Sequence, residues 1–269
     1  VVVRAEGAEM TGRLSPEFLE KEKVRLGSNK YSGLMQQRPT AAEGGTVKLA
    51  WWRFFQYDDR ALVPDRAKRG PDGVDAKFPT TVIHKVGTWT KQWDFDWTVI
   101  SVDAAAKRTE RGSQHGILVV SGKGIQRFIR DDKTCRGDIL DVIKAVKKLC
   151  AQYDPDRILI EDKAMGSDLS TMFRNEFQNG DIRGSNGKPL MLRVDEVNPG
   201  AAGKEARLDS CLPEIEAGVV HILECGTWVD KFLGEVCGFP LATYDDRVDA
   251  LSMALNHMRK HSSYVLPKW

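Results

Sequence analysis

Carboxylates stand at the ends of three elements that the sequence predicts. Asp103 ends one apolar run, Glu161 ends another, and Asp245, Asp246 and Asp249 open the last predicted helix. In an open α/β sheet the carboxyl ends of the strands face one crevice, so the first two acids can converge. Asp246 and Asp249 are three residues apart and share a helix face, so they could complete the cluster. The spacing therefore predicts a site built from acids.

A cluster of acids makes chemical sense chiefly if divalent cations neutralise it, because carboxylates at close range repel one another. Hard oxygen ligands select Mg²⁺ or Mn²⁺ over softer metals. Two such ions about 3.5 to 4 Å apart lower the pKa of an attacking water and stabilise the leaving oxygen in phosphodiester hydrolysis. The pattern predicts a two-metal nuclease, which needs no nucleophilic Ser or Cys.

Each acid also has a purely structural interpretation. An Asp that follows a strand often caps a turn, which would explain Asp103. Asp245 and Asp246 suit a first helical turn, where a carboxylate stabilises the helix dipole by about 0.3 to 1 kcal/mol. Glu161 follows a strand too apolar to face solvent, and Asp249 lies too far into the helix to act as a cap. The joint occurrence of the acids favours a functional site, in which we prefer Asp246 over Asp245 because of its spacing from Asp249.

Basic side chains that could pair with DNA phosphates surround the predicted crevice. They are Lys107, Arg108 and Arg111 in the turn after the first acid, Lys163 beside Glu161, and Lys204 and Arg207 on one helix face. Lys163 could instead pair with Asp162, and the others could belong to a solvated turn and an ordinary helix surface.

Composition places the chain among ordinary globular proteins. Its 269 residues, 41% of them apolar, suffice for one sizeable domain with an appendage. The net charge of +2 does not by itself indicate a nucleic-acid binder, so any attraction for phosphate must be local. No apolar run long enough to cross a membrane and no secretory leader is evident, and we expect a cytosolic protein.

Other chemistries find little support. Five cysteines without a close C-x-x-C pair argue against both a disulfide framework and a zinc site. His257 and His261 lie at a polar helix end, where we expect solvated side chains rather than ligands. A motor ATPase is excluded for this stretch because it contains no G-x-x-x-x-G-K-[ST] loop.

The elements that must position the acids follow an α/β order from Trp93 onward. The Gly122-Lys123-Gly124 turn predicts a hairpin between the second and third strands. We expect strands at 97–103, 115–121, 125–130, 157–161, 189–194 and 219–223, and helices at 137–151, 168–177, 204–216, 228–236 and 245–260. This order predicts a ribonuclease H-like mixed central sheet flanked by helices.

The first ninety residues lack the alternating strand and helix pattern of the later part of the chain. Their sequence predicts an N-terminal extension of helices and loops. Ser15 and Pro16 begin a helix that we expect to end near Gly27, and a second short helix is expected at 31–38. Residues 57–79 are rich in Asp, Arg, Gly and Pro, which is typical of a surface loop or linker.

The acidic motifs resemble those of a known family, the nuclease domain of the large terminase subunit of tailed bacteriophages. The residues that carry the resemblance are Asp103-Ala104-Ala105, the run 160–166 around Glu161, the run 244–251 around Asp246 and Asp249, Lys204 and Arg207 with the stretch 216–219, and Phe239-Pro240. Residues 31–39 also resemble the segment that joins the packaging motor to the nuclease. The resemblance covers about residues 30–260.

The resemblance implies an endodeoxyribonuclease that cuts concatemeric viral DNA during genome packaging. It implies that Asp103, Glu161 and Asp249, with Asp246 as a fourth contributor, hold two Mg²⁺ or Mn²⁺ ions. Tyr244 stands where the family often has His, so a histidine ligand is lost here. Ala104 likewise stands where the family often has Pro.

The resemblance also implies a division of the chain and a set of partners. Residues 1–90 would be an extension and linker toward a motor ATPase domain of a longer parent chain, and residues 91–269 the nuclease domain. The first residue, Val1, is consistent with a piece of such a chain. Implied partners are double-stranded DNA, that motor domain, a small terminase subunit and a capsid portal, in the host cell cytoplasm.

Two alternatives remain open at the level of sequence. A Holliday-junction resolvase-like nuclease of the same fold also combines a strand Asp, a strand Glu and a helical D-x-x-D, and junction specificity would distinguish it. A non-catalytic portal-docking module would carry the acids for structural reasons. A metal titration separates that module from an enzyme, because the module should bind Mn²⁺ weakly and leave DNA intact.

Overall fold

The described residues form one mixed sheet of nine strands, on which the helices pack. The computed structural model describes residues 21, 25, 46–57, 81–83, 95–104, 113–161, 166–190 and 192–261. The strands are β1 (Arg53–Tyr57), β2 (Thr81–Ile83), β3 (Trp97–Asp103), β4 (Ser113–Lys123), β5 (Gln126–Asp132), β6 (Cys135–Gly137), β7 (Arg157–Glu161), β8 (Arg193–Val197) and β9 (Val220–Leu223).

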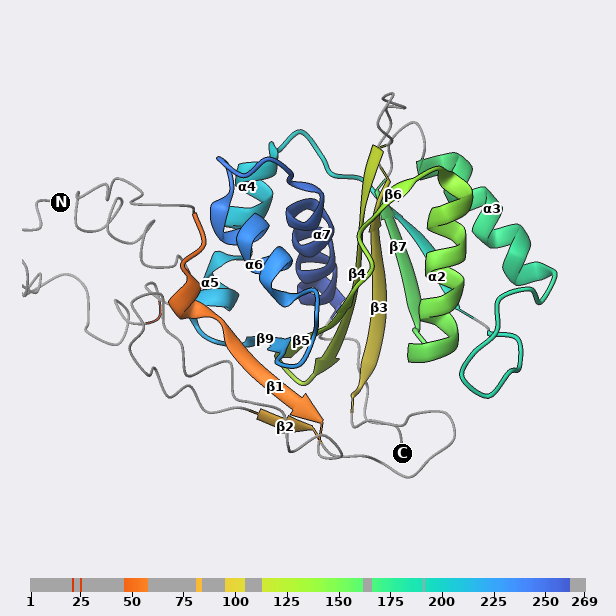
Figure 1. The fold of residues 1–269 in the computed structure, drawn as a ribbon, viewed down its shortest axis with the longest axis horizontal. Coiled ribbons are helices and arrows are strands. Elements are labelled where there is room, and N and C mark those ends of the chain that lie inside the picture. Colours follow the sequence, from red (N-terminus) through yellow and green to blue (C-terminus); the bar gives the residue numbers. More distant parts are fainter. Residues whose placement is uncertain are drawn as a thin grey trace, which may run out of the picture.

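The sheet has the order β2-β1-β9-β5-β4-β3-β7-β8, and β6 pairs with β4 outside this path (Figure 1). β4 runs antiparallel to β3, β5 and β6, whereas the other described neighbours are parallel. β3 and β7 therefore point the same way, and their carboxyl ends meet at one edge of the sheet.

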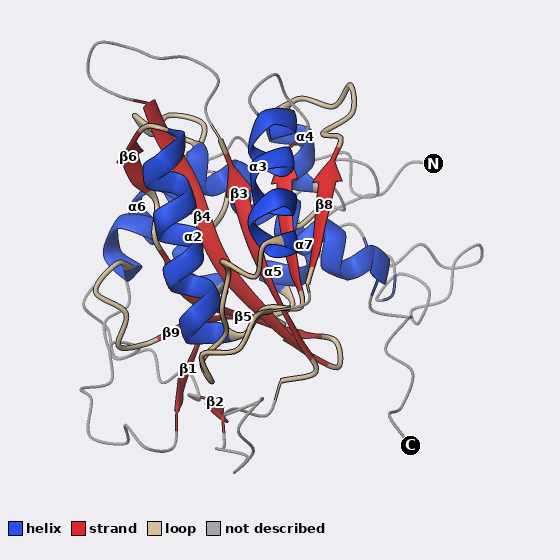
Figure 2. Ribbon diagram, turned by 90° about the vertical axis from the view of Figure 1, so that its right-hand side faces the viewer, coloured by secondary structure: helices blue, strands red, loops and turns tan. Residues whose placement is uncertain are grey.

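Helices cover both faces of this sheet. They are α2 (Ile139–Tyr153), α3 (Gly166–Gln178), α4 (Lys204–Asp209), α5 (Leu212–Glu216), α6 (Val229–Gly238) and α7 (Asp246–His261), with a short 3-10 helix, η1 (Leu49–Trp51). α2 and α3 pack on one face and α4 to α7 on the other, which gives two separate apolar cores (Figure 1, Figure 2). The described helices include none that is long and apolar enough to cross a membrane.

Alternation along the strands divides their side chains between the two cores. On β7, Ile158 and Ile160 join the core under α2 and α3, while Leu159 joins the core under α7. All three are fully buried, as expected for a strand covered on both faces. A capping box between Asp138 and Asp141 begins α2 and satisfies its first backbone amides.

The predicted α/β architecture is confirmed, with differences at the boundaries of some elements. The strands at 97–103 and 157–161 are observed with the predicted bounds. The strand expected at 189–194 is instead β8, because Pro189 forms an isolated bridge with Arg183 before the strand begins. The helix expected at 204–216 is divided into α4 and α5 around Cys211, since Pro213 suits a new first turn and cannot continue the previous helix. β6 was not anticipated.

Part of the predicted N-terminal extension belongs to the sheet. β1 pairs in parallel with β9, and its Phe55 packs edge-on against Phe128 at a ring-centroid distance of 5.2 Å. Trp52, just before β1, is fully buried against Phe232. The helices expected at 15–27 and 31–38 lie outside the described residues, apart from Lys21 and Arg25, which are helical. The loop expected at 57–79 also lies outside them beyond Tyr57, and the domain boundary near residue 90 stays a prediction.

Close packing positions the first turn of α7 against the sheet. Ser101 on β3 donates a hydrogen bond from its hydroxyl to the carbonyl of Ala250 at 2.8 Å. Gly116 on β4 lies so near that a Cβ there would be 2.2 Å from the carbonyl oxygen of Asp246. Only a glycine leaves room for this approach.

A buried charge network holds the same turn from the other side. Arg247 is 11% exposed and lies 2.5 Å from Asp132 of β5 and 2.6 Å from Glu235 of α6. Its backbone amide also donates to Glu235 at 2.7 Å. The network therefore links β5, α6 and the beginning of α7.

We predict that Gly116→Ala lowers the free energy of unfolding by about 1 to 3 kcal/mol, because the added methyl group overlaps the backbone of α7. Urea denaturation followed by circular dichroism measures the change. Gly234→Ala in α6 is the matched control, since nothing lies within 4 Å of its added Cβ. That control should raise stability by about 0.5 to 1 kcal/mol. Equal stability of the two variants would contradict the close approach.

We predict that Arg247→Met destabilises the protein by about 3 to 5 kcal/mol, because Asp132 and Glu235 remain buried without their shared cation. Lys144→Met removes a cation from an exposed pair with Asp141 and should change stability by less than about 1 kcal/mol. The same urea titration compares them. A loss as small for Arg247→Met as for the control would show that the network does not hold α7.

Candidate active site

Two of the predicted acids end neighbouring parallel strands. Val102 of β3 pairs with Ile160 of β7, so Asp103 and Glu161 follow side by side. Val102 and Ile160 face the core under α2 and α3, and strand alternation therefore turns both acids toward α7. Each acid is only 6% exposed. The predicted convergence of the strand ends is thus present in the fold.

The first turn of α7 lies at the same edge of the sheet. Asp103 pairs across β3 and β4 with Gly116, the residue that approaches the backbone of Asp246. Asp249, also in the first turn of α7, is 3% exposed. Helix and strand ends therefore bring acids from three distant parts of the chain to one region.

Arg207 of α4 connects two of these acids directly. Its Nη1 lies 3.3 Å from Glu161 Oε1, and its Nη2 forms an ion pair with Asp249 Oδ1. The Arg207 side chain is 15% exposed. Glu161 and Asp249 thus converge on one partly buried cation.

Lys204, one turn earlier on the same face of α4, supplies a second cation. Its Nζ lies 2.6 Å from Asp249 Oδ2 and 2.7 Å from Asp245 Oδ1. Burial lowers the pKa of Lys204, but the hydrogen bonds and charges of Asp245 and Asp249 raise it by more, so the net shift is upward. Lys204 therefore stays protonated between the two acids.

Asp246 occupies a negative, partly buried position at the start of α7. Burial raises its pKa, the charges of Glu235 and Asp245 raise it further, and Lys204 opposes them. Asp245, rather than Asp246, shares Lys204 with Asp249. The preference for Asp246 as a fourth contributor stays a prediction.

The predicted phosphate-binding residues divide into two groups. Lys204 and Arg207 contact the acids as described, a role that the sequence did not indicate. Two basic residues three apart on a helix, such as Lys204 and Arg207, are common in proteins. Their spacing therefore does not indicate that they contact acids. Lys107, Arg108, Arg111 and Lys163 lie outside the described residues.

The carboxylates at this site are suitable ligands for a divalent cation, although side chains of α4 contact them in this structure. Buried carboxylate oxygens are the donors that Mg²⁺ and Mn²⁺ prefer. Within the described part of the chain, no three His, Cys, Asp or Glu side chains are arranged to hold a metal ion as they stand. Glu161 and Asp249 are bridged by Arg207 instead. All five cysteines are free thiols.

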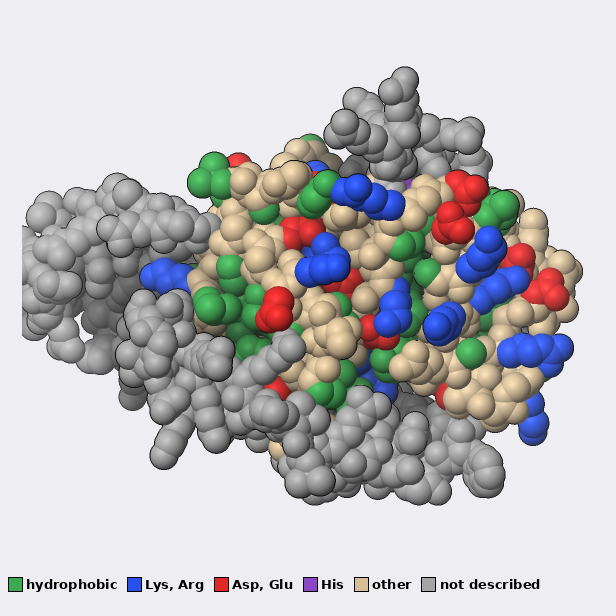
Figure 3. Space-filling model, in the orientation of Figure 1, with side chains coloured by type: hydrophobic (Ala, Val, Ile, Leu, Met, Phe, Trp, Pro, Cys, Tyr) green, Lys and Arg blue, Asp and Glu red, His purple; other side chains and the backbone are tan. Residues whose placement is uncertain are grey.

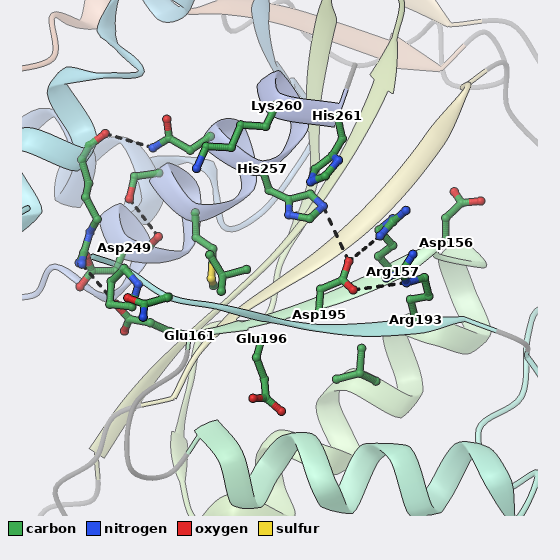
Figure 4. Close-up of a pocket in the computed structure, with 18 of the residues that line it drawn as sticks. Asp156, Arg157, Glu161, Arg193, Asp195, Glu196, Asp249, His257, Lys260 and His261 are labelled. Atoms are coloured by element: carbon green, nitrogen blue, oxygen red, sulfur yellow. Dashed lines mark hydrogen bonds and ion pairs between the residues drawn. The ribbon is translucent and has the colours of Figure 1, made fainter. Parts of the chain in front are cut away.

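A groove of about 1040 Å³ leads away from the acids along α7 and β8. Glu161, Asp249 and Arg207 line one end of it, and Figure 4 shows Asp195 and His257 toward the other. The sequence did not indicate this groove, because its walls come from elements far apart in the chain.

A mixed charge cluster lies at the far end of the groove. Arg157 and Arg193 lie 2.6 and 3.5 Å from Asp195 (Figure 4). His257 has a side chain only 9% exposed, so the expectation that it is solvated was wrong. Burial lowers its pKa to about 4, which keeps the ring neutral near pH 7.

Positive charge also gathers elsewhere on the molecule. Figure 3 shows Lys and Arg side chains over the part of one face where α2 and α3 lie in Figure 1. The sequence of α2 supplies Lys144, Lys147 and Lys148 to its outer side. The small net charge of the whole chain is therefore compatible with a local concentration of basic side chains.

Comparison with solved structures supports the fold. Large terminase from the thermophilic bacteriophage D6E superposes with a TM-score of 0.55 at 9% identity, covering 91% of this chain and 53% of that one. The chain therefore spans about half the length of that terminase. The large terminase nuclease of thermophilic phage G20c gives a TM-score of 0.42 at 14% identity, covering 61% of this chain and 82% of that chain. For the human cytomegalovirus terminase nuclease domain the TM-score is 0.41 at 12% identity, with 61% and 85% covered. Identities this low concern the fold alone.

Comparison with sequence families identifies the family to which the chain belongs. No curated protein sequence matches the chain. The model of the terminase RNaseH-like domain matches residues 100–258, a span that begins within β3 and ends within α7. This span is more than half of the chain and includes Asp103, Glu161 and Asp249. The ribonuclease H-like fold predicted from the sequence is thereby confirmed, and the chain belongs to the family of terminase RNaseH-like domains.

Proposed function

We propose that this chain is a metal-dependent endodeoxyribonuclease that cuts concatemeric viral DNA during genome packaging. The observation that carries the proposal is the convergence of Glu161, at the end of β7, and Asp249, on α7, upon Arg207. Replacing a buried ion pair by apolar residues is often neutral or stabilising, so folding alone gives little reason for two buried acids from distant segments. Their position at the carboxyl edge of the sheet suits a substrate that approaches from solvent.

Four acids would hold the metal ions in this proposal: Asp103, Glu161, Asp249 and Asp246. When bound, two Mg²⁺ or Mn²⁺ ions supply an activated water and neutralise the charge that develops on the leaving oxygen. The chain's own contribution is to fix the acids through β3, β7 and α7 and to limit the access of water. Lys204 and Arg207 are the described cations nearest to a phosphate placed at the acids.

The proposed setting follows from family membership and from the length of the related terminase. The chain covers 53% of the D6E large terminase, so we propose a motor ATPase domain elsewhere in the parent chain. Double-stranded DNA would be the substrate, and a small terminase subunit and a capsid portal would be partners in the host cell cytoplasm. Lys107, Arg108, Arg111 and Lys163 are further proposed DNA contacts.

We predict that the purified protein nicks and linearises supercoiled plasmid with Mn²⁺ or Mg²⁺, and that EDTA stops the reaction. Asp103→Ala should abolish cutting, a loss of at least about a hundredfold, because a carboxylate ligand is removed. Agarose electrophoresis measures the conversion. Asp181→Asn, at an exposed position away from the acids, is the control and should keep the wild-type rate.

Intact plasmid at every metal concentration, together with no binding of Mn²⁺, would contradict the nuclease and favour the portal-docking module. Preferential cutting of four-way junctions over linear duplex would favour the resolvase-like alternative. Both comparisons use the same protein preparation.

A pair of variants tests the choice between neighbouring acids. We predict that Asp246→Asn reduces plasmid cutting by at least about tenfold, whereas Asp245→Asn reduces it less, because Asp246 and Asp249 share a face of α7. Initial nicking rates at saturating Mn²⁺ measure the difference. The reverse order would assign the fourth position to Asp245, which already shares Lys204 with Asp249.

A further inference from the structure

Two cations of α4 occupy the oxygens that the proposed metal ions would need. Arg207 contacts Glu161 Oε1 and Asp249 Oδ1, and Lys204 contacts Asp249 Oδ2 and Asp245 Oδ1. Both oxygens of the Asp249 carboxylate are therefore paired with α4. A divalent ion that binds Asp249 must compete with these cations for its oxygens, and at Glu161 it must compete for Oε1.

The pairs are needed when no metal is bound. Glu161 and Asp249 are 6% and 3% exposed, and an unpaired charge at such depth is strongly destabilising. Arg207 pairs with both at once, and Lys204 supplies the second positive charge. Without metal, the cations that stabilise the two buried acids therefore occupy oxygens that a metal ion would bind.

The position of α4 allows these contacts to be exchanged. α4 has six residues, and Gly203, the N-cap residue that precedes Lys204, has no side chain with which to form a capping hydrogen bond. Lys204 is 37% exposed, and Arg207 lines the groove that leads from the acids. Small rotations of the two side chains would therefore turn their charges from the acids toward the groove.

A DNA phosphate beside the acids is a natural new partner for both cations. Guanidinium and ammonium groups form charge-assisted hydrogen bonds with phosphate as they do with carboxylate. Two divalent ions would bring four positive charges to the four proposed acids, and the phosphates would neutralise the two cations that move. Neither the acids nor the displaced cations are then left without an opposite charge.

We propose that α4 acts as an ion-exchange latch: Lys204 and Arg207 neutralise the acids in the metal-free protein and pass to DNA phosphates when divalent ions bind. This inference rests on the proposed nuclease function and adds that metal and DNA bind cooperatively. The physical reason is that each ligand removes the competitor of the other. Coupling between two ligands is reciprocal, so DNA must tighten metal binding by the same factor as metal tightens DNA binding.

The test is calorimetric titration of Mn²⁺ into the full chain, with and without a short duplex. Phosphorothioate linkages in the duplex keep the negative charge and resist hydrolysis. For the wild type we expect the duplex to raise the affinity for Mn²⁺ by about tenfold, within the 5- to 150-fold range usual for such coupling.

Substitutions of single cations distinguish the latch from a general electrostatic effect of removing any positive charge near the groove. Arg207→Gln should bind Mn²⁺ at least about fivefold more tightly than the wild type without DNA, and should lose most of the effect of the duplex. Arg174→Gln is the matched control, because Arg174 also lines the groove but pairs with Glu196 at 2.8 Å instead of with the acids. It should bind Mn²⁺ without DNA as the wild type does.

Stability provides a second readout that does not involve cutting. Arg207→Gln should melt at a lower temperature than the wild type without metal, and saturating Mn²⁺ should restore more of its stability than it adds to the wild type. Should Arg207→Gln fail to fold, Lys204→Gln is the milder variant, since its side chain is partly exposed. It should show the same changes in Mn²⁺ affinity and duplex effect, each smaller.

The latch is overturned if removing these cations leaves the affinity for Mn²⁺ and the effect of the duplex unchanged. In that case a wild-type protein that still binds Mn²⁺ and cuts plasmid would retain the proposed function without the latch. Failure of the wild type to bind Mn²⁺ at all, with or without DNA, would overturn both.

Discussion

Repulsion between buried acids is the constraint around which this part of the molecule is organised. Glu161 and Asp249 come from β7 and α7 and are nearly inaccessible to water, so each requires a positive partner. Arg207 provides it for both, and Lys204 extends the pairing to Asp245. A site assembled in this way is stable without metal, and its carboxylate oxygens already lie close together. The cations that stabilise it are also the groups best placed to meet a phosphate.

The surrounding fold maintains this arrangement through rigid contacts on both sides of α7. β3 and β7 run in parallel register, so their terminal acids emerge together on the face that α7 covers. Gly116 allows the first turn of α7 to lie directly on β4. Arg247 attaches the same turn to β5 and α6 through two buried carboxylates. The acids are therefore carried on regular elements, which hold their geometry better than loops would.

Membership of the terminase RNaseH-like family and the partial coverage of a related terminase give these features a context. Under the proposed function, the ion pairs would keep the acids paired until metal and DNA bind together, without any large movement. The groove along α7 and β8 adds a surface on which a substrate could be oriented relative to the acids.

The sequence by itself determined the alternation of strands and helices, the ribonuclease H-like order, and the three places where acids end elements. These signals are local: a buried strand such as 157–161 is recognisable from its own residues, and so is the acid that ends it. Only the tertiary structure decided that β1 joins the sheet beside β9, that α4 and α5 are separate, and that the side chain of His257 is largely covered. It also decided that Lys204 and Arg207 contact acids, because Arg207, Glu161 and Asp249 meet only after three distant segments have packed together. Contacts between distant segments leave no periodic pattern in the chain. The sequence therefore shows which residues are charged but not which of them meet.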